Sequence, residues 1–300
     1  MSPIVRFFPN SPYLLLVLTM LFWSGNFVLG RAVRELFTPL TLSFWRWATA
    51  LVLLLPFTLP QLRTHWPVIR QHWKALTLLS VLGVVNFNTF AYLGLQHTMA
   101  TNAVIMLSIT PVLIVALSFL LLRQRINRWQ ALGITVSLLG VLVIVARGDW
   151  HTLRGLQLNH GDLWVLMAVL SWALYSVCLR WRPTDLPPLA FLATTIAIGV
   201  PILLLLYLWD LSRGATLAIG PVTLASIAYV AIFPSILAYI FWNRAIAELG
   251  PNRAGQFLHL MPAFGAIESM IFLGERLYTF HIAGIVLIAT GIYLATLMRR

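Results

Sequence analysis

The sequence predicts an all-α membrane protein of ten transmembrane helices, built as two inverted five-helix repeats around a central cavity. Long uncharged apolar runs, a scarcity of charge and an internal repeat predict it. Of the 300 residues, 60% are hydrophobic and only 9% are charged, whereas a soluble domain carries about 25% charged residues. A soluble fold of this length still exposes roughly a quarter of its surface. A bilayer therefore has to take up the apolar area.

Ten apolar runs can be marked along the chain. About 20 apolar residues cross the ~30 Å hydrocarbon core at 1.5 Å per residue. Such spans have to be helical because lipid offers no partner for backbone N–H and C=O groups, and the runs lack the alternation of a barrel strand. The expected spans are 12–30, 39–59, 73–95, 100–122, 129–146, 163–179, 187–208, 221–243, 254–273 and 280–298.

The net charge of +12 reflects membrane orientation rather than nucleic-acid binding, because Lys and Arg lie almost entirely between the apolar runs. The side with both termini carries roughly twice as many of them as the other side, which predicts cytoplasmic termini. We expect a multi-pass protein of the bacterial cytoplasmic (inner) membrane. The single cysteine, Cys178, allows no intramolecular disulfide.

The second half of the chain repeats the first. Pro111, Arg125, Gly133 and Gly140 recur 151 residues later as Pro262, Arg276, Gly284 and Gly291, and Trp23 and Arg31 recur 149 residues later as Trp172 and Arg180. Each half, 13–146 and 162–298, holds an odd number of spans, so the halves cross the membrane in opposite senses. Inverted repeats of this kind are typical of alternating-access transporters with a site near the midplane.

Several of these residues resemble the EamA domain. They are Trp23-Ser24-Gly25-Asn26-Phe27, Phe44-Trp45-Arg46, and Gly274-Glu275-Arg276-Leu277 followed by Gly284 and Gly291. The EamA domain occurs in tandem in the ten-helix branch of the drug/metabolite transporter superfamily, and the resemblance covers roughly 13–298. The chain is most similar to YddG-type exporters of aromatic amino acids and related compounds. The resemblance implies export of small amphipathic metabolites; another metabolite or drug class is the alternative.

Two departures from this pattern stand out. Arg123-Gln124-Arg125 replaces the Gly-Glu-Arg of the family in the first half, which leaves the turn there open. The first span has no acid, whereas small cation-exporting relatives carry a membrane-embedded glutamate there. Its absence counts against their proton-coupled cation mechanism.

Polar and aromatic residues inside the spans predict a substrate site, because each is costly in lipid unless it is paired or wetted. Aromatic planes mixed with uncharged hydrogen-bonding groups suit a ligand with a flat apolar part and a polar end. The alternative is that these residues form hydrogen bonds between packed helices. His259 is either a proton-responsive group or a neutral, hydrogen-bonded histidine. The candidates are Trp23, Asn26, Asn88, Tyr92, Ser108, Trp172, Tyr175, Tyr239, Asn243 and His259.

Two charges and four helix-weakening residues also fall inside spans. Arg46 and Glu268 lie at similar depth, so they either form an ion pair or extend to their nearer surfaces. Gly83, Pro111, Pro234 and Pro262 predict gating hinges or static kinks.

A membrane-embedded enzyme is the competing interpretation. The eight acids form no close pair within a span, the seven histidines are scattered, and no nucleophile or phosphate-loop motif is present. We therefore predict no catalytic residue, metal or cofactor. The expected partners are the lipid bilayer and a small-molecule substrate. One chain holds both halves, so a monomer suffices, although a dimer stays open.

Overall fold

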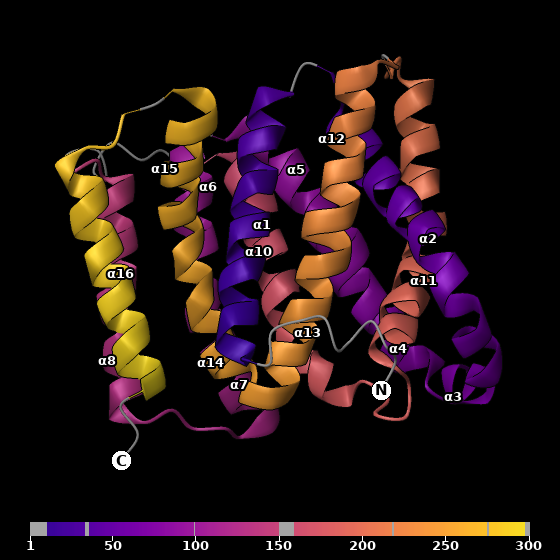
Figure 1. Cartoon of the computed structure of the whole chain (residues 1–300), viewed down its shortest axis with the longest axis horizontal. Coiled ribbons are helices and arrows are strands. Elements are labelled where there is room, and N and C mark those ends of the chain that lie inside the picture. Colours follow the sequence, from indigo (N-terminus) through magenta and orange to yellow (C-terminus); the bar gives the residue numbers. More distant parts are fainter. Residues whose placement is uncertain are drawn as a thin grey trace.

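The computed structural model describes residues 11–33, 36–98, 100–149, 159–217, 219–274 and 276–297. Within these ranges the chain is a bundle of helices without a strand (Figure 1). Nine of the described helical segments are long and apolar enough to cross a membrane. The remaining predicted span, 254–273, lies in a segment that is helical over 251–273. It carries Gln256, His259 and Glu268, whose polar side chains lower its hydropathy. The predicted all-α, ten-helix fold is confirmed.

The first half begins and ends at opposite ends of the bundle. Its spans are α1 (Pro12–Ala32); α2 (Pro39–Thr64), followed by the short α3 (Trp66–Gln71); α4 (Trp73–Ser80), η2 (Val81–Asn86) and α5 (Phe87–His97); α6 (Ala100–Ser108) and α7 (Thr110–Leu122); and α8 (Arg128–Val145).

The second half follows the same order in the opposite sense. Its spans are α10 (His160–Cys178), ending in η3 (Leu179–Trp181); α11 (Pro188–Ser212); α12 (Pro221–Ala231), η4 (Ile232–Leu237) and α13 (Ala238–Leu249); α14 (Pro251–Gln256), η5 (Phe257–His259) and α15 (Leu260–Leu273); and α16 (Thr279–Leu297). The start of α1 and the end of α16 lie at the same end of the bundle (Figure 1), which we call the terminal end.

Local sequence explains where several helices begin and end. Proline occupies the first turn of α1, α2, α11 and α12, where its missing N–H costs nothing. Asn127 and Asn159 close capping boxes at the starts of α8 and α10. At the end of α7, Arg123 takes the left-handed conformation (φ 54°) that Gly274 takes 151 residues later (φ 69°). The same turn therefore forms in the first half without glycine, at a cost of about 1–2 kcal/mol.

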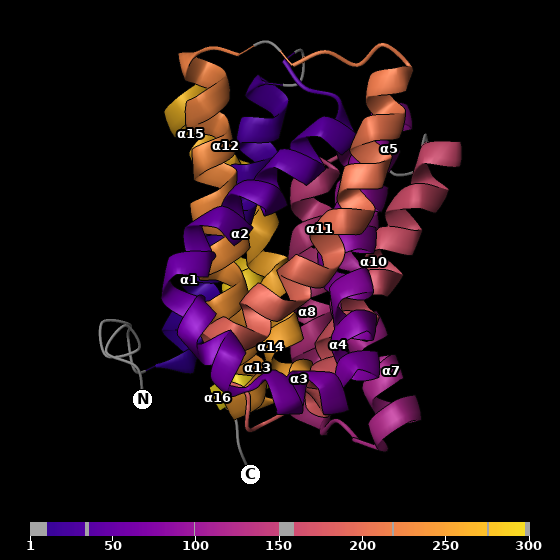
Figure 2. The ribbon, with the colours of Figure 1, turned by 90° about the vertical axis from the view of Figure 1, so that its right-hand side faces the viewer.

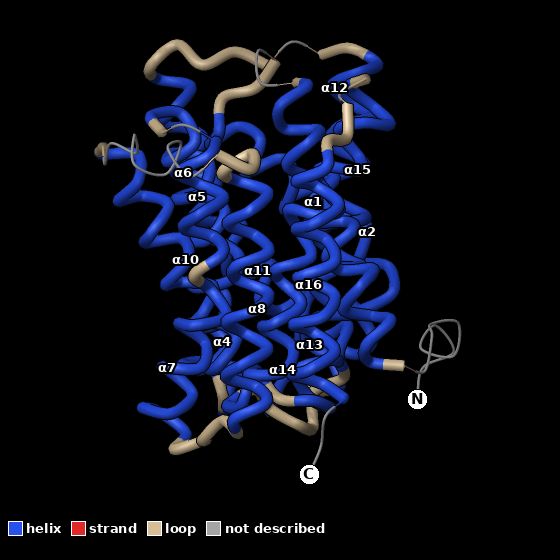
Figure 3. The backbone as a smooth tube through the Cα atoms, turned by 90° about the vertical axis from the view of Figure 1, so that its left-hand side faces the viewer, coloured by secondary structure: helices blue, strands red, loops and turns tan. Residues whose placement is uncertain are grey.

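The two halves meet at one flank through α8 and α16, which lie side by side (Figure 3). A Cβ added at Gly133 would lie 2.4 Å from the carbonyl oxygen of Gly291, and one at Gly140 would lie 2.7 Å from that of Gly284. Since Gly284 and Gly291 are the repeat partners of Gly133 and Gly140, the two contacts are the same contact seen from each half. Small residues allow this close approach, and a pseudo-twofold axis passes between the helices.

Helices α2, α11 and α4 form the opposite flank (Figure 2). Large apolar side chains such as Phe57, Leu120 and Leu205 are exposed on the outside of the bundle, where a bilayer covers them. The most completely buried large side chains are Trp47, Trp172 and Trp242 in the interior. The interior is thus more polarisable and hydrogen-bonding than the lipid-facing surface.

The third and eighth spans share an irregularity. Each changes for six residues into a π-helix, η2 over Val81–Asn86 and η4 over Ile232–Leu237, 151 residues apart. Gly83 lies in the first segment and Pro234 in the second. A π-helix leaves backbone groups without their usual helical partners and is frequent at functional sites.

Candidate functional site

The segment 23–26 of α1 connects this helix to several others, beginning with two hydrogen bonds. Trp23 Nε1 donates to the carbonyl oxygen of Pro234 in η4 at 3.0 Å. Ser24 Oγ donates to Glu268 Oε2 on α15 at 2.5 Å. Successive side chains on a helix point roughly 100° apart, so the two bonds lie on different sides of α1.

The next two residues of the segment complete the set. Gly25 leaves room for the hydroxyl of Tyr229 on α12, because a Cβ at this position would lie 2.2 Å from it. Asn26 contacts the hydroxyl of Tyr92 on α5 at 3.5 Å. Each residue of the Trp-Ser-Gly-Asn motif therefore faces a different element of the bundle.

Arg46 of α2 is the hub of the polar interior, although it lies within a membrane span. Its side chain is buried, with 2% of the residue exposed. The guanidinium donates to Ser235 Oγ (2.5 Å), Asn88 Oδ1 (3.0 Å), the Tyr92 hydroxyl (3.1 Å) and the Pro234 carbonyl (3.1 Å). All four acceptors are neutral. These bonds use four of the five N–H donors of the group.

The structure does not pair Arg46 with Glu268, and neither extends to a surface. Glu268 is bonded to Ser24 and is only 8% exposed. Within the described residues Arg46 has no acidic partner. Both of the alternatives that equal depth suggested are therefore wrong, because the two groups face different sides of α1. A charge at the centre of a bilayer costs about 2.5–3.5 kcal/mol, which the four hydrogen bonds of Arg46 offset.

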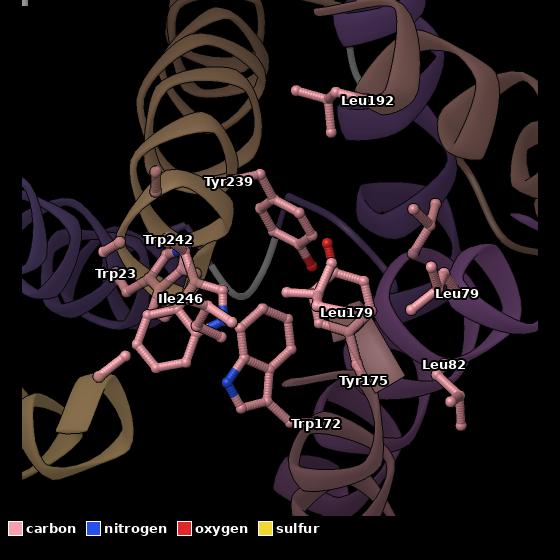
Figure 4. Packing of buried hydrophobic residues seen from close by; sticks show 14 of the residues in the cluster. Trp23, Leu79, Leu82, Trp172, Tyr175, Leu179, Leu192, Tyr239, Trp242 and Ile246 are labelled. Atoms are coloured by element: carbon pink, nitrogen blue, oxygen red, sulfur yellow. The ribbon is translucent and has the colours of Figure 1, made fainter. Parts of the chain in front are cut away.

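Six aromatic side chains pack together beside Arg46, and we call them the aromatic cluster. They are Trp23, Trp47, Trp172, Tyr175, Tyr239 and Trp242. Figure 4 shows five of them with their rings turned toward one another. The rings of the repeat partners Trp23 and Trp172 meet edge to face at 4.9 Å, so the pseudo-twofold axis passes through the cluster.

Arg46 and the aromatic cluster form one site. The guanidinium carbon lies 5.2 Å from the ring centroid of Trp47, and Arg46 shares the Pro234 carbonyl with Trp23. The indole N–H groups of Trp47, Trp172 and Trp242 are buried and have no hydrogen-bond partner among the described residues. An unpaired buried donor costs about 1–3 kcal/mol, so the cluster holds donors that a ligand with an acceptor group can satisfy.

Four of the predicted residues form two equivalent pairs. Asn26 faces Tyr92 in the first half, and the Tyr175 hydroxyl donates to Asn243 Oδ1 at 2.8 Å in the second. Asn26 and Tyr175 are repeat partners, as are Tyr92 and Asn243. Each half thus joins its first and third spans through one amide and one phenol, with the two residue types exchanged.

Ser108 and His259 form a separate group. His259 Nε2 lies 3.0 Å from the Ser108 carbonyl oxygen, and its Nδ1 lies 2.6 Å from Ser137 Oγ. Among the described residues, no hydrogen bond or ring contact joins them to Arg46 or to the aromatic cluster. Since Ser108 and His259 are repeat partners in contact, they mark a second point on the axis.

The four predicted gating residues lie where the helices are irregular. Gly83 and Pro234 lie in the π-segments, and both of their carbonyls accept side-chain hydrogen bonds, Gly83 from the Tyr239 hydroxyl at 2.5 Å. Pro111 follows the break between α6 and α7 at Ile109, and Pro262 follows the 3₁₀ turn η5. These positions are where a span can bend without losing further backbone bonds.

A cavity of about 540 Å³ lies away from this site, near the terminal end. It is lined by Gln124, Arg125, Asn127, Gln130, Leu249, Gly250, Asn252 and Arg253. Sequence reasoning did not predict it, because its walls come from two helix junctions far apart in the chain, that of α7 with α8 and that of α13 with α14. In the described ranges, no three His, Cys, Asp or Glu side chains lie close enough together to hold a metal ion.

Sequence reasoning missed three parts of the site. It left open whether Arg46 pairs with Glu268 or extends to a surface, and it passed over Trp47 and Trp242. Trp47 follows Arg46, and Trp242 precedes the predicted Asn243, so their positions beside polar in-span residues were the available signal. Sequence alone does not tell which tryptophans face the interior.

The fold and this site define a class of protein, a membrane transporter built from two inverted repeats. The chain belongs to the EamA-like transporter family, whose model matches residues 10–146 and 159–297. It is 27% identical to the transporter YyaM of Bacillus subtilis over 95% of this chain and 93% of that one. It is also 27% identical to a Salmonella typhimurium protein described as "Probable amino-acid metabolite efflux pump", over 93% of each chain.

One solved crystal structure shares the fold. It is 18% identical, superposes with a TM-score of 0.79, and the match covers 97% of this chain and 98% of the other. At this identity the likeness concerns the fold alone. The chain is thus a multi-pass protein whose partners are a lipid bilayer and a small-molecule substrate.

Proposed function

We propose that this protein exports small amphipathic metabolites that carry a carboxylate, with aromatic amino acids as the first candidates. The observation that carries the proposal is the buried guanidinium of Arg46, which has no acidic partner in the described structure and lies beside the aromatic cluster. A carboxylate would complement the charge, and an aromatic ring would stack among the tryptophans and tyrosines. The described relative from Salmonella typhimurium and the resemblance to YddG-type exporters support this direction.

The proposed site combines the Arg46 hub with the predicted residues around it. Asn88 and Tyr92 hold the guanidinium in place. The other contributors are Trp23, Asn26, Trp172, Tyr175, Tyr239 and Asn243. Ser108 and His259 remain in the proposal as a second, neighbouring point on the axis.

In the described conformation the aromatic cluster is packed on itself, so a ligand can enter only when its rings separate. We propose that the halves 13–146 and 162–298 move against each other in alternating access, bending at Gly83, Pro111, Pro234 and Pro262. The Lys and Arg distribution supports a bacterial inner-membrane location with the terminal end in the cytoplasm. A monomer is the proposed unit because it contains both halves.

The test is uptake of labelled phenylalanine or tryptophan into liposomes that contain the purified protein, with empty liposomes as the control. We expect saturable flux that falls by at least about tenfold, equivalent to 1.4 kcal/mol, when Tyr239 or Trp172 is replaced by alanine. Absence of flux with every aromatic amino acid would contradict the substrate assignment. A metabolite and drug screen would then identify the class.

A further inference from the structure

Glu268 is a buried acid inside a span, and the proposed site makes no use of it. Asp162, the other buried acid of the described residues, lies in the first turn of α10. Its carboxylate accepts from Ser24 Oγ at 2.5 Å, and its Oε1 would lie 3.3 Å from a Cβ at Gly25. The hydroxyl of Tyr229 lies against the same point of α1. The acid is therefore enclosed where α1, α12 and α15 converge.

No cation neutralises this acid within the described part of the chain. Arg46 is bonded to four neutral groups, and the described ion pair of α13 joins Arg244 to Glu248 instead. A carboxylate inside a bilayer without a cation is costly, and such residues commonly mark proton or ion pathways. Binding a proton removes the cost.

The hydrogen bonds around Glu268 suit both of its protonation states. The Ser24 hydroxyl has two acceptors within reach, Glu268 Oε2 at 2.5 Å and the Leu21 carbonyl oxygen at 3.0 Å. It can donate to the carboxylate when Glu268 is ionised. When the acid is protonated, its own O–H can donate to Ser24 Oγ while the serine turns its hydrogen to Leu21. No donor or acceptor is lost in either state.

Several titratable side chains lie on the elements that pack against α15. The one placed beside Glu268 is Tyr229, whose hydroxyl lies at the same point of α1. The remaining titratable side chains on these elements are Tyr13 on α1, His259 on η5, Arg128 on α8, and His281 and Tyr293 on α16. Arg31 also belongs to α1, but its side chain is outside the described part of the structure. His259 is held by Ser108 and Ser137.

The acid is also connected to the proposed substrate site. Ser24 is the neighbour of Trp23, which shares the Pro234 carbonyl with Arg46. A change of the Ser24 hydrogen bond therefore acts on the turn of α1 that carries a wall of the aromatic cluster. Ser24, which is bonded to Glu268, and Trp23, which shares an acceptor with Arg46, are thus adjacent residues of one helix.

We propose that Glu268 is the proton-binding site that couples export to the proton gradient, and this rests on the proposed function. A proton from water on the side opposite the terminal end binds a carboxylate oxygen of Glu268. The same proton leaves to water on the terminal side in the other conformation, in exchange for substrate. No other bond forms or breaks.

The experiment compares two assays in proteoliposomes containing the full chain. Counterflow of labelled phenylalanine against unlabelled phenylalanine at equal pH reports transport without coupling. Accumulation of phenylalanine in vesicles with an acidic interior reports coupling. We expect Glu268→Gln, which keeps the shape and hydrogen bonding of the side chain, to retain counterflow within about twofold and to lose accumulation. Glu248→Gln, which removes an exposed surface acid, is the matched control and should keep both.

Accumulation by Glu268→Gln at the parent's level would overturn the proposal. Counterflow by the parent without accumulation, or accumulation driven by a sodium gradient instead, would overturn it as well and leave the exporter assignment standing.

A second measurement separates failure of the proton site from failure of the substrate assignment. Infrared difference titration of the protein in nanodiscs should show a protonated-carboxyl band that changes with pH in the parent and in Glu248→Gln but is missing in Glu268→Gln. Ser24→Ala should keep the band and move the pH at which it appears. The same band in Glu268→Gln, or its absence from the parent, would overturn the proton site whichever substrate is carried.

Discussion

The two halves build the same junction and complete it differently. At one junction, Trp23 of α1 donates to the Pro234 carbonyl in η4. At the other, the indole N–H of the equivalent Trp172 of α10 has no partner in the part of the chain that the structure describes, and the Gly83 carbonyl in η2 accepts from Tyr239. The two junctions are related by the repeat. We interpret the difference as the asymmetry that an alternating-access protein shows in any single conformation.

The second difference concerns charge. Helices α2 and α11 both begin with proline, 149 residues apart, and both pack against a π-segment of the other half. The same offset relates Arg46 on α2 to Thr195 on α11. The carbonyl of Thr195 accepts from Ser80 Oγ at 2.6 Å. The scaffold is duplicated, whereas at this pair of equivalent positions the buried guanidinium belongs to the first half alone.

The largest expected effect comes from removing that charge. Arg46→Ala leaves four interior acceptors without their donor, so we expect phenylalanine flux to fall by at least about a hundredfold, or 2.7 kcal/mol. Arg46→Lys should restore little, because an ammonium cannot reproduce the planar fork. Thr195→Ala, at the equivalent position, should keep flux within about twofold. Equal loss in both alanine variants would mean that the halves contribute alike.

A smaller effect is expected where the halves are alike. Gly133→Ala and its repeat partner Gly284→Ala both force a methyl group against the facing helix. We expect each to lower the free energy of unfolding by about 1–3 kcal/mol, the usual cost of overpacking. Gly265→Ala is the control, since no atom of the described residues lies within 4 Å of a Cβ there. Thermal unfolding in detergent measures all three, and an unchanged Gly133→Ala would contradict the close crossing.

The next comparison uses the two tryptophans of the junctions. Trp23→Phe removes a hydrogen bond worth about 0.5–1.5 kcal/mol, whereas Trp172→Phe removes a donor that is unpaired within the described structure. Trp23→Phe should therefore be less stable than Trp172→Phe by at least this amount. Both changes delete the same atoms, so their difference isolates the bond to Pro234. The thermal unfolding midpoint of Trp23→Phe should therefore lie below that of Trp172→Phe. Equal midpoints would contradict the proposed difference between the two junctions.

The smallest effect is expected at the amide–phenol pairs. Tyr175→Phe removes a 2.8 Å hydrogen bond, and such bonds between membrane helices average about 0.6 kcal/mol. Loss of the Asn26–Tyr92 contact in Asn26→Ala should lower the free energy of unfolding by less, because the two atoms are 3.5 Å apart. Urea or thermal unfolding measures the loss of stability in each variant. A larger loss for Asn26→Ala than for Tyr175→Phe would mean that the first half, and not the second, is more tightly closed.

Much of the fold follows from sequence because the bilayer restricts the choices. The apolar runs predict the spans, and the fixed offset predicts that Gly133 and Gly284 hold equivalent places in the two halves. The offsets also correctly relate Asn26 to Tyr175. The site itself was less predictable. Equal depth suggested that Arg46 meets Glu268, but depth says nothing about which side of α1 each group faces.

Two further features depend on contacts that a single sequence does not reveal. The π-segments form around Gly83 and Pro234, yet only their tertiary hydrogen bonds show that both carbonyls are used. Arg123 adopts a left-handed turn that sequence preference assigns to glycine. In both places tertiary packing outweighs local propensity.

The central claim is that Arg46 recognises a carboxylate beside the aromatic cluster, and a pair of inhibitors tests it most directly. Phenethylamine and phenylalanine share the ring and differ by the carboxylate, so each should be tested as an inhibitor of labelled phenylalanine flux in proteoliposomes. We expect phenylalanine to inhibit flux through the parent protein at least about tenfold more strongly than phenethylamine does, a difference of 1.4 kcal/mol. Equal inhibition by the two compounds would show that the carboxylate is not recognised and would contradict the proposed role of Arg46.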